Sequence, residues 1–96
     1  MILHTVSSSP FHDFSLQHCL KHFSEGDYLL LMNDAVISAN TSNEHQAVLL
    51  AIHKQDCLFV LAADLKARDL HAEIGKVIDY IDFVNLTVRC QSQIAW

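Results

Sequence analysis

The chain has 96 residues, of which 51% are hydrophobic and 18% are charged, and its formal net charge is −5. This length predicts one domain spanning residues 1–96, and the hydrophobic content excludes an intrinsically disordered protein. The negative charge disfavours direct binding to nucleic acid or to an anionic membrane surface, since both carry negative charge themselves. No apolar run approaches the ~20 residues of a membrane helix and no signal peptide is visible, so a cytoplasmic protein is expected.

Apolar residues are abundant for so short a chain. The mean hydropathy is +0.21, and a small domain leaves much of its surface in contact with water. Apolar surface left over on a small soluble protein usually marks a subunit interface. We therefore expect the chain to form oligomers; the alternative is a monomer with a well-filled core.

Strand and helix signals alternate from the N-terminus onward. The first strand is predicted at Ile2–Val6. The helix that follows is predicted to begin at Pro10, with Ser9 as its N-cap, and to end near Phe23. Gly26 is the predicted C-cap of this helix, because glycine takes the left-handed conformation without strain.

Two continuously apolar runs predict strands that are covered on both faces, as in a parallel sheet: Tyr28–Met32 and Cys57–Leu61. The remaining predicted elements are a helical turn at Ala35–Ala39, helices at Glu44–His53, Asp64–Asp69 and Asp82–Cys90, a weaker strand at Val77–Tyr80 and an edge strand at Ile94–Trp96. This alternation predicts an α/β fold, a small three-layer sandwich with a mainly parallel sheet of about five strands.

Helical periodicity predicts which side chains of three helices face the core. These are Leu16, Cys19, Leu20 and Phe23 in the first helix, Val48, Leu49 and Ile52 in the Glu44–His53 helix, and Phe83, Leu86 and Val88 in the last.

Ligands of parallel α/β sheets bind at the carboxyl ends of the strands. The segments expected there are Ser7–Pro10, Asn33–Asp34 and Ala62–Asp64. No glycine-rich dinucleotide or phosphate loop and no GxSxG turn occurs in the sequence, and no cofactor is predicted. For Asp34 and Asp64, a capping role is favoured over catalysis, because neither carboxylate has a visible partner.

The three cysteines, Cys19, Cys57 and Cys90, are an odd number without paired spacing, so no disulfide framework is expected. Cys19 is next to His18 and one turn before His22, and a nearby imidazolium lowers a thiol pKa. A partly exposed Cys19 could thus accept a sulfur atom as a persulfide; the alternative is a small apolar side chain between helix and sheet. Cys57 is expected to be inert, and Cys90 ends a helix, where the dipole disfavours a thiolate.

His18 and His22 are also spaced to share a metal ion on one helix face. No acidic or cysteine partner completes the ligand set, so we expect solvated histidines and predict no metal site. A metal- or ligand-binding α/β domain is kept as a third hypothesis.

Several segments, taken together in this order, resemble one known family. They are Ile2–Val6 followed by Ser9-Pro10, Ser24–Asp27 leading into Leu29–Leu31 and Asp34, Asp64–Arg68, Asp79-Tyr80, Asp82–Val84 with Leu86-Thr87, and Gln93–Trp96. This pattern is similar to that of the TusB/DsrH family of sulfur-relay subunits. It spans nearly the whole chain and is weakest from Ile37 to Gln55.

The resemblance implies a small DsrE/F/H-like α/β fold and a non-catalytic subunit of a sulfur-transfer complex. TusB-like chains assemble with TusC-like and TusD-like paralogues as a dimer of heterotrimers. The TusBCD-type heterohexamer passes persulfide sulfur from a TusA-like carrier to a TusE-like carrier, toward 2-thiolation of the tRNA wobble uridine. The principal sulfur-bearing cysteine belongs to the TusD-like or DsrE-like subunit.

The segment Ser15–Lys21, with Cys19 inside it, looks more like the DsrH branch, where a cysteine stands at this place. DsrH-like chains serve sulfur oxidation in a DsrEFH complex. The resemblance to this branch implies that Cys19 is an auxiliary sulfur acceptor or a contact residue, and the choice between the two branches stays open at this point.

Overall fold

The computed structural model describes residues 1–96 and contains one sheet of five parallel strands in the order β4-β3-β2-β1-β5. The strands are β1 (Ile2–Val6), β2 (Tyr28–Leu31), β3 (Leu58–Leu61), β4 (Lys76–Ile78) and β5 (Ser92–Ala95). The α-helices are α1 (Ser15–His22), α2 (Ile37–Asn40), α3 (Gln46–Lys54), α4 (Ala62–Ala67) and α5 (Tyr80–Arg89), and a 3-10 turn, η1, covers Asn33–Val36. The predicted parallel α/β architecture is confirmed.

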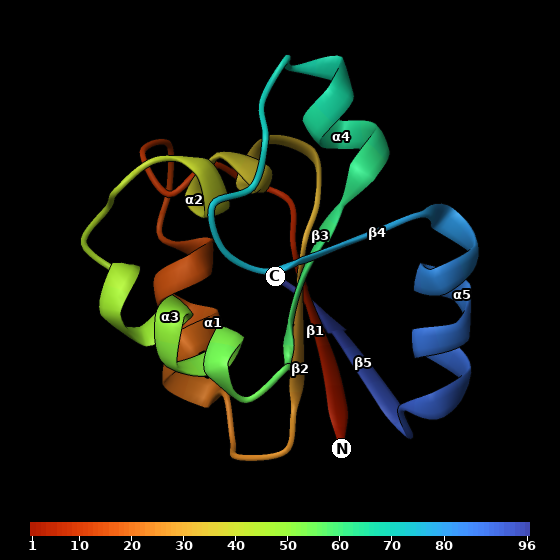
Figure 1. Cartoon of the computed structure of the whole chain (residues 1–96). Coiled ribbons are helices and arrows are strands. Elements are labelled where there is room, and N and C mark those ends of the chain that lie inside the picture. Colours follow the sequence, from red (N-terminus) through yellow and green to blue (C-terminus); the bar gives the residue numbers. More distant parts are fainter.

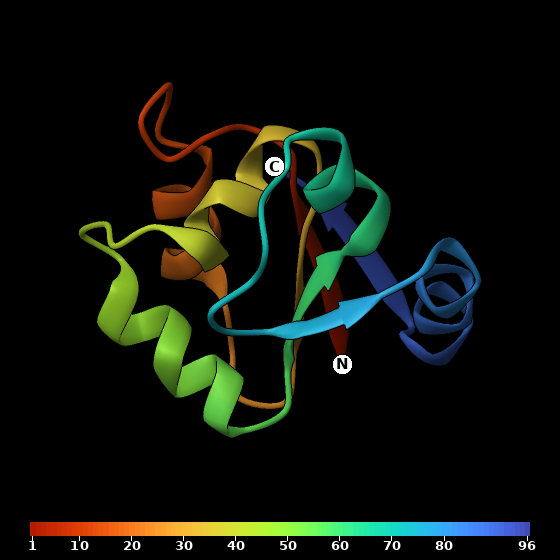
Figure 2. The same ribbon diagram turned by 45° about the horizontal axis from the view of Figure 1, so that its top comes forward.

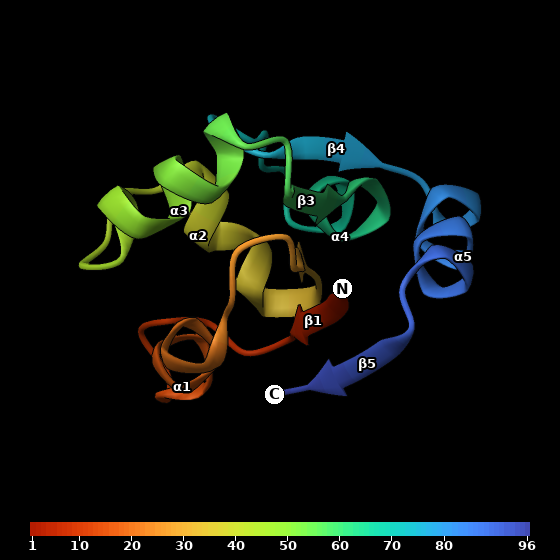
Figure 3. The same ribbon diagram turned by 90° about the horizontal axis from the view of Figure 1, so that it is seen from below.

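The helices form a layer on each side of the sheet. Figures 1 and 3 show α1, α2 and α3 on one face and α5 alone on the other. Successive strands from β1 to β4 step across the sheet in one direction, and β5 then returns to pair with the far side of β1. Right-handed crossovers in opposite directions place their helices on opposite faces, which explains why α5 is separate.

Two buried apolar clusters lie on the two faces of the sheet. The larger one includes Leu16, Cys19, Leu29, Leu31, Leu49 and Val60 and joins the sheet to α1, η1, α2 and α3. The smaller one lies under α5 and consists of Leu3, Leu30, Phe59, Leu61, Ile78, Leu86 and Cys90. The apolar runs in β2 and β3 supply both clusters, as expected for strands covered on both faces.

The first helix begins later than predicted. Ser9 Oγ accepts a hydrogen bond from the Phe11 N–H at 3.1 Å, and this caps a single turn only. The chain then restarts at Asp13, whose carboxylate accepts the Ser15 N–H at 3.0 Å as α1 begins. Gly26 has a positive φ of 90°, but it lies in the turn beyond the end of α1 and does not cap the helix.

Two of the predicted core-facing valines point outward. Val48 of α3 is 48% exposed and Val88 of α5 is 79% exposed, whereas Leu49, Ile52 and Leu86 are buried. Each residue turns by about 100° along a helix, so Val88, two residues after Leu86, lies on the opposite side of α5. The other predicted boundaries differ from the observed ones by one or two residues.

No helix of the structure is both long and apolar enough to span a membrane.

Candidate functional site

The carboxyl ends of β2 and β3 lie near one another beside α4, at the upper end of the sheet in Figure 2, and the side chains there form a small charged cluster. The Asn33 N–H donates to Asp64 Oδ2 at 2.7 Å. Arg68 donates from Nε and Nη2 to Asp34 Oδ1 at 3.0 and 2.9 Å. The structure thus brings the predicted Asn33–Asp34 and Ala62–Asp64 segments together. Asp34 pairs with Arg68 and Asp64 accepts a backbone N–H, which ties the end of β2 to α4, but neither carboxylate caps the helix in which it lies.

The third predicted segment, Ser7–Pro10, leads from β1 into a loop with exposed aromatic side chains. Phe11 and Phe14 are 64% and 67% exposed, and neither packs into a core cluster. Both lie between β1 and α1, near the carboxyl edge of the sheet. Exposed aromatic side chains are more typical of contact surfaces than of a free surface in water.

A buried polar network that the sequence analysis did not single out joins three distant parts of the chain. His4 of β1 is fully buried, and its Nε2 lies 2.9 Å from Asp27 Oδ2 in the turn before β2. The indole Nε1 of Trp96, at the chain end, lies 3.0 Å from His4 Nδ1. Asp27 also accepts the Ile2 N–H at 3.0 Å and the Ser24 N–H at 3.1 Å.

The hydrogen-bonding chemistry of this network fixes where its protons are. Since an indole N–H can only donate, His4 Nδ1 must be the acceptor and the imidazole proton sits on Nε2, where it donates to Asp27. His4 is therefore neutral and Asp27 is a carboxylate. Burial by itself raises the pKa of Asp27, but the hydrogen bonds from His4 and from the two backbone N–H groups prevail and lower it.

The role of this network is to stabilise the fold. Its polar atoms are paired with one another, and Asp27 is 4% exposed. Phe23 packs on the His4 ring at 5.3 Å between ring centroids, and His22 packs on Trp96 at 5.2 Å. The sequence signal was the dipeptide Gly26-Asp27 together with the terminal Trp96, but no local rule pairs residues so far apart in the chain.

Cys19, the predicted sulfur acceptor, lies in the larger apolar cluster and has no exposed surface. Burial raises the pKa of its thiol to about 12, and the Asp27 carboxylate acts in the same direction. The partial exposure that the acceptor hypothesis assumed is absent in this conformation, and His18 and His22 are exposed on other faces of α1. The sulfur-acceptor role of Cys19 stays a prediction, and it now requires the thiol to become accessible.

The other two thiols are buried as well. Cys57 directly precedes β3 and is 8% exposed, and Cys90 ends α5 and is 6% exposed. Burial is the main cause that raises the pKa of both thiols, with Asp56 adding to it at Cys57. All three cysteines are free.

Outside the His4 network, three histidines each contact a different partner. His22 Nδ1 lies 2.9 Å from the His18 backbone oxygen, one helical turn earlier. His53 Nδ1 accepts the Gly75 N–H at 3.0 Å, and His71 pairs with Glu73 at 2.7 Å. No three His, Cys, Asp or Glu side chains are grouped as metal ligands would be.

Comparison of the sequence with known families identifies the family of this chain. The family described as DsrH like protein matches residues 8–93. The chain belongs to the DsrH-like family. It is 39% identical over 100 residues to a protein named TusB from Pectobacterium parmentieri, with 99% of this chain and 100% of that one covered. Proteins named TusB from Cronobacter sakazakii and Yersinia pestis are 39% identical over 98 residues, with the same coverage.

The fold also matches that of a protein whose structure has been solved. The crystal structure of the YchN protein from E. coli superposes with a TM-score of 0.81, covering 99% of this chain and 97% of that one, at 15% identity. This likeness confirms the DsrE/F/H-like fold that the resemblance implied. Membership in the DsrH-like family, with relatives named TusB, is consistent with a sulfur-relay subunit.

Proposed function

We propose that this chain is the TusB-type subunit of a heterohexameric sulfur relay in the cytoplasm, in which its role is structural and in docking. Its partners in the assembly are TusC-like and TusD-like paralogues. The complex takes persulfide sulfur from a TusA-like carrier and passes it to a TusE-like carrier. The sulfur is finally used for 2-thiolation of the wobble uridine in tRNA.

The placement of the thiols carries this proposal. Sulfur transfer through persulfides needs an accessible thiolate, since the thiolate is the nucleophile. The three thiols of this chain are buried, and burial raises the pKa of each. A subunit with such cysteines supports the transfer by holding a paralogue that bears an accessible thiolate.

The exposed apolar side chains give the docking role its physical basis. Phe11 and Phe14 stand out from the β1–α1 loop, and Tyr80 and Ile81 stand out from α5 with about 70% of their surface exposed. Burying an apolar side chain of this size at an interface contributes roughly 1.5–3 kcal/mol. Contact with sister subunits would remove this surface from water.

The tRNA-thiolation branch is favoured over sulfur oxidation, because the curated relatives described above are named TusB. The test is to delete the gene in the organism that encodes this chain and to quantify 2-thiouridine in its tRNA by mass spectrometry. The thiolated nucleoside should disappear and return when the wild-type chain is supplied. Unchanged thiolation after deletion would contradict the proposal.

Complementation with Cys19→Ala separates a docking subunit from a sulfur acceptor. Alanine removes the sulfur atom and leaves the rest of α1 unaltered. The docking role predicts that this variant restores most of the 2-thiouridine, provided that circular dichroism shows it to be folded. A folded variant that restores none would instead support the prediction that Cys19 accepts sulfur.

A further inference from the structure

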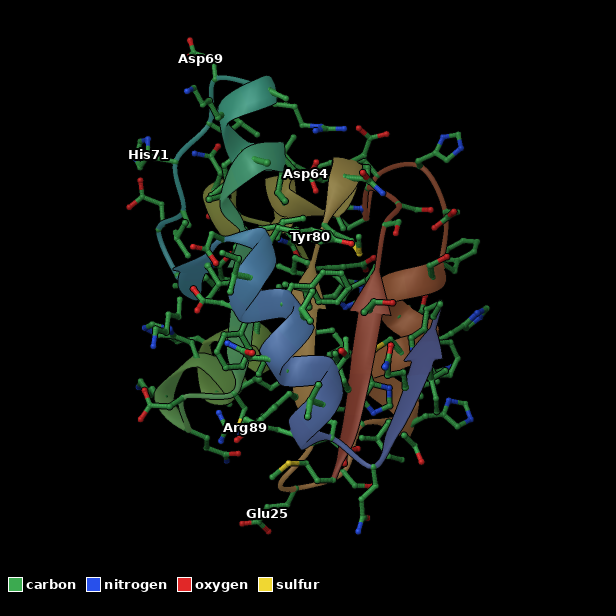
Figure 4. The ribbon with its side chains drawn as sticks, turned by 90° about the vertical axis from the view of Figure 1, so that its right-hand side faces the viewer. Glu25, Asp64, Asp69, His71, Tyr80 and Arg89 are labelled. Carbon is green, nitrogen blue, oxygen red and sulfur yellow. The ribbon has the colours of Figure 1, made fainter.

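Helix α5 has apolar side chains on both of its sides. Leu86 and the capping residue Cys90 face the sheet, and four further residues form an outer stripe on the opposite side. The outer stripe consists of Tyr80, Ile81, Val84 and Val88, which are 68%, 70%, 44% and 79% exposed. Figure 4 looks onto this helix, with Tyr80 near its beginning and Arg89 near its end. Exposed apolar side chains that gather on one side of a helix form a contiguous patch of the kind that marks an interaction site, so the outer stripe indicates a covering partner.

We propose that the outer stripe is covered by α5 of a second copy of this chain, in an antiparallel pair related by a two-fold axis. This rests on the proposed function, because a dimer of heterotrimers contains two copies of the chain. The inference names the surface through which the two copies meet.

The spacing of the outer stripe is self-complementary. Tyr80 and Val88 are each four residues from Val84, so all three lie on one face of the helix. A two-fold axis at Val84 places Tyr80 of one copy opposite Val88 of the other, and Val84 opposite itself. An isologous contact requires such a pattern, since the same patch must fit its own rotated copy.

The charges of α5 favour the antiparallel direction. Asp79 and Asp82 stand at the N-terminal end of the helix and form its capping box, and Arg89 stands at the C-terminal end. An antiparallel pair sets the acidic end of each helix beside the basic end of the other, whereas a parallel pair would align like charges. No charged residue belongs to the outer stripe itself, so the contact would bury no unpaired charge.

The charged and polar side chains beside α5 line a hollow of about 440 Å³ between this helix and β4, which Val88 at the end of the outer stripe also borders. They are Lys76, Asp82, Asn85 and Arg89. Arg89 also donates to the Tyr28 hydroxyl at 3.2 Å, which holds it at this side of α5. These groups border the outer stripe and stay in contact with water when it is covered.

The size of the outer stripe sets the strength of the contact. From Tyr80 to Val88 the helix rises about 12 Å, and four side chains offer less than the ~800 Å² per partner that a standard interface buries. The free chain should therefore dimerise weakly and in a concentration-dependent manner. Within each heterotrimer, packing against the paralogues would hold α5 in place, so less conformational freedom is lost when the two copies meet than when two free chains meet.

The free chain provides the first test, by sedimentation velocity over a range of concentrations. The wild type should shift from the 10.8 kDa of one chain toward twice that mass as concentration rises. Val84→Asp should raise the dissociation constant at least about tenfold, because it puts a charge at the centre of the contact. The matched control is Val48→Asp, since Val48 is 48% exposed on α3, on the other side of the sheet.

A wild type that stays monomeric throughout, or an equal loss of dimer in Val84→Asp and Val48→Asp, would overturn the proposal. Cross-linking gives a readout that does not depend on the aspartate variant. With a short bismaleimide, Val84→Cys should form covalent dimers, because two copies of residue 84 face each other at the axis. Val48→Cys should form few, and the three native thiols are buried. Equal cross-linking of both variants would contradict the antiparallel pair.

The co-expressed complex separates this inference from the proposed function. If the wild-type chain forms no complex with its paralogues, the proposed function fails. If the wild type forms a heterohexamer and Val84→Asp a heterotrimer of half its mass, the α5 pair is supported. A Val84→Asp variant that keeps the full mass, or that loses its paralogues altogether, contradicts the α5 pair and leaves the proposed function standing.

Discussion

Burial controls the chemistry of single residues in this chain, most clearly at Cys19. With a pKa raised to about 12 by its surroundings, the thiol is ionised at pH 8 in roughly one molecule in ten thousand. The same cluster that protects it contains the apolar faces of α1 and β2. As long as this packing is closed, Cys19 behaves as a small apolar side chain.

Thiol titration tests this protection. In native buffer at pH 8, the chain should react with an aromatic disulfide reagent at far less than one thiol per chain within a minute. After unfolding in guanidinium chloride, all three thiols should react at once. One thiol that reacts within seconds in the native chain, and that is missing in Cys19→Ala, would contradict the protected state and favour the sulfur-acceptor prediction.

Asp27 is a buried carboxylate whose protonation should destabilise the chain in acid. Its hydrogen bonds favour the carboxylate form, and its pKa is lowered in the folded chain even though burial acts against this. A carboxylate with a depressed folded pKa contributes stability that is present above its ordinary pKa, near 4, and is lost as pH falls toward the folded pKa. The stabilisation by Asp27 is therefore complete at neutral pH and declines in acid below about pH 4.

Urea unfolding of Asp27→Asn between pH 3 and pH 7 measures this contribution. We expect a loss of about 2 kcal/mol at pH 7, because an amide cannot replace all the hydrogen bonds of the carboxylate. The difference from wild type should shrink as the pH falls below 4. Glu25→Gln, an exposed change in the same turn, should match the wild type. An Asp27→Asn chain as stable as the wild type at pH 7 would refute this account.

At the scale of secondary-structure elements, Gly75 governs the entry into β4. It has a positive φ of 88°, and a Cβ placed on it would lie 2.7 Å from Val60 Cγ2 and 3.3 Å from Leu58 Cγ of β3. Its N–H also donates to His53 at the end of α3. The backbone can approach β3 this closely only because glycine has no side chain.

The two glycines of the chain provide a matched pair of variants. Gly26 has nearly the same φ of 90°, but nothing lies within 4 Å of a Cβ placed there. Gly26→Ala should cost about 1 kcal/mol from backbone strain alone. Gly75→Ala should cost about 2–4 kcal/mol, since overpacking is added to the strain. Equal losses in thermal unfolding of the two variants would show that the contact with β3 is not tight.

The elements also show what the sequence could reveal. The apolar runs in β2 and β3 were sufficient to predict buried parallel strands, because no polar residue interrupts them. The start of α1 was misplaced, because the Ser9-Pro10 signal is real but caps only one turn before Asp13 restarts the chain. Local patterns identify a capped turn, but they do not determine how far the helix behind it continues.

Candidate residues were harder to predict than elements. The meeting of Asn33–Asp34 with Ala62–Asp64 followed from the parallel topology, which brings successive carboxyl ends to one edge. The His4–Asp27–Trp96 network did not, since it depends on β5 returning to the far side of β1 and on the resulting position of Trp96. The complete burial of Cys19 was also not predictable, because it results from tertiary packing of α1 on the sheet and not from the spacing of residues in the sequence.

In the whole molecule, the two faces of the sheet are covered to different extents, and several apolar side chains are left exposed. One face of the sheet is covered by α1, α2 and α3, whereas α5 alone covers the other (Figure 3). All four residues of the edge strand β5 are exposed, and exposed apolar side chains stand on α5 and in the β1–α1 loop. Such a surface is expected for a subunit whose neighbours complete it.

Native mass spectrometry of the chain co-expressed with its TusC-like and TusD-like paralogues tests whether the chain is a subunit of a heterohexamer. We expect one dominant species that contains two copies of each chain and that dissociates into equal heterotrimers. A Cys19→Ala variant should give the same species, since the thiol is enclosed within its own subunit. If the chain were detected only by itself, with no species that also contains the paralogues, it would not be a subunit of this complex.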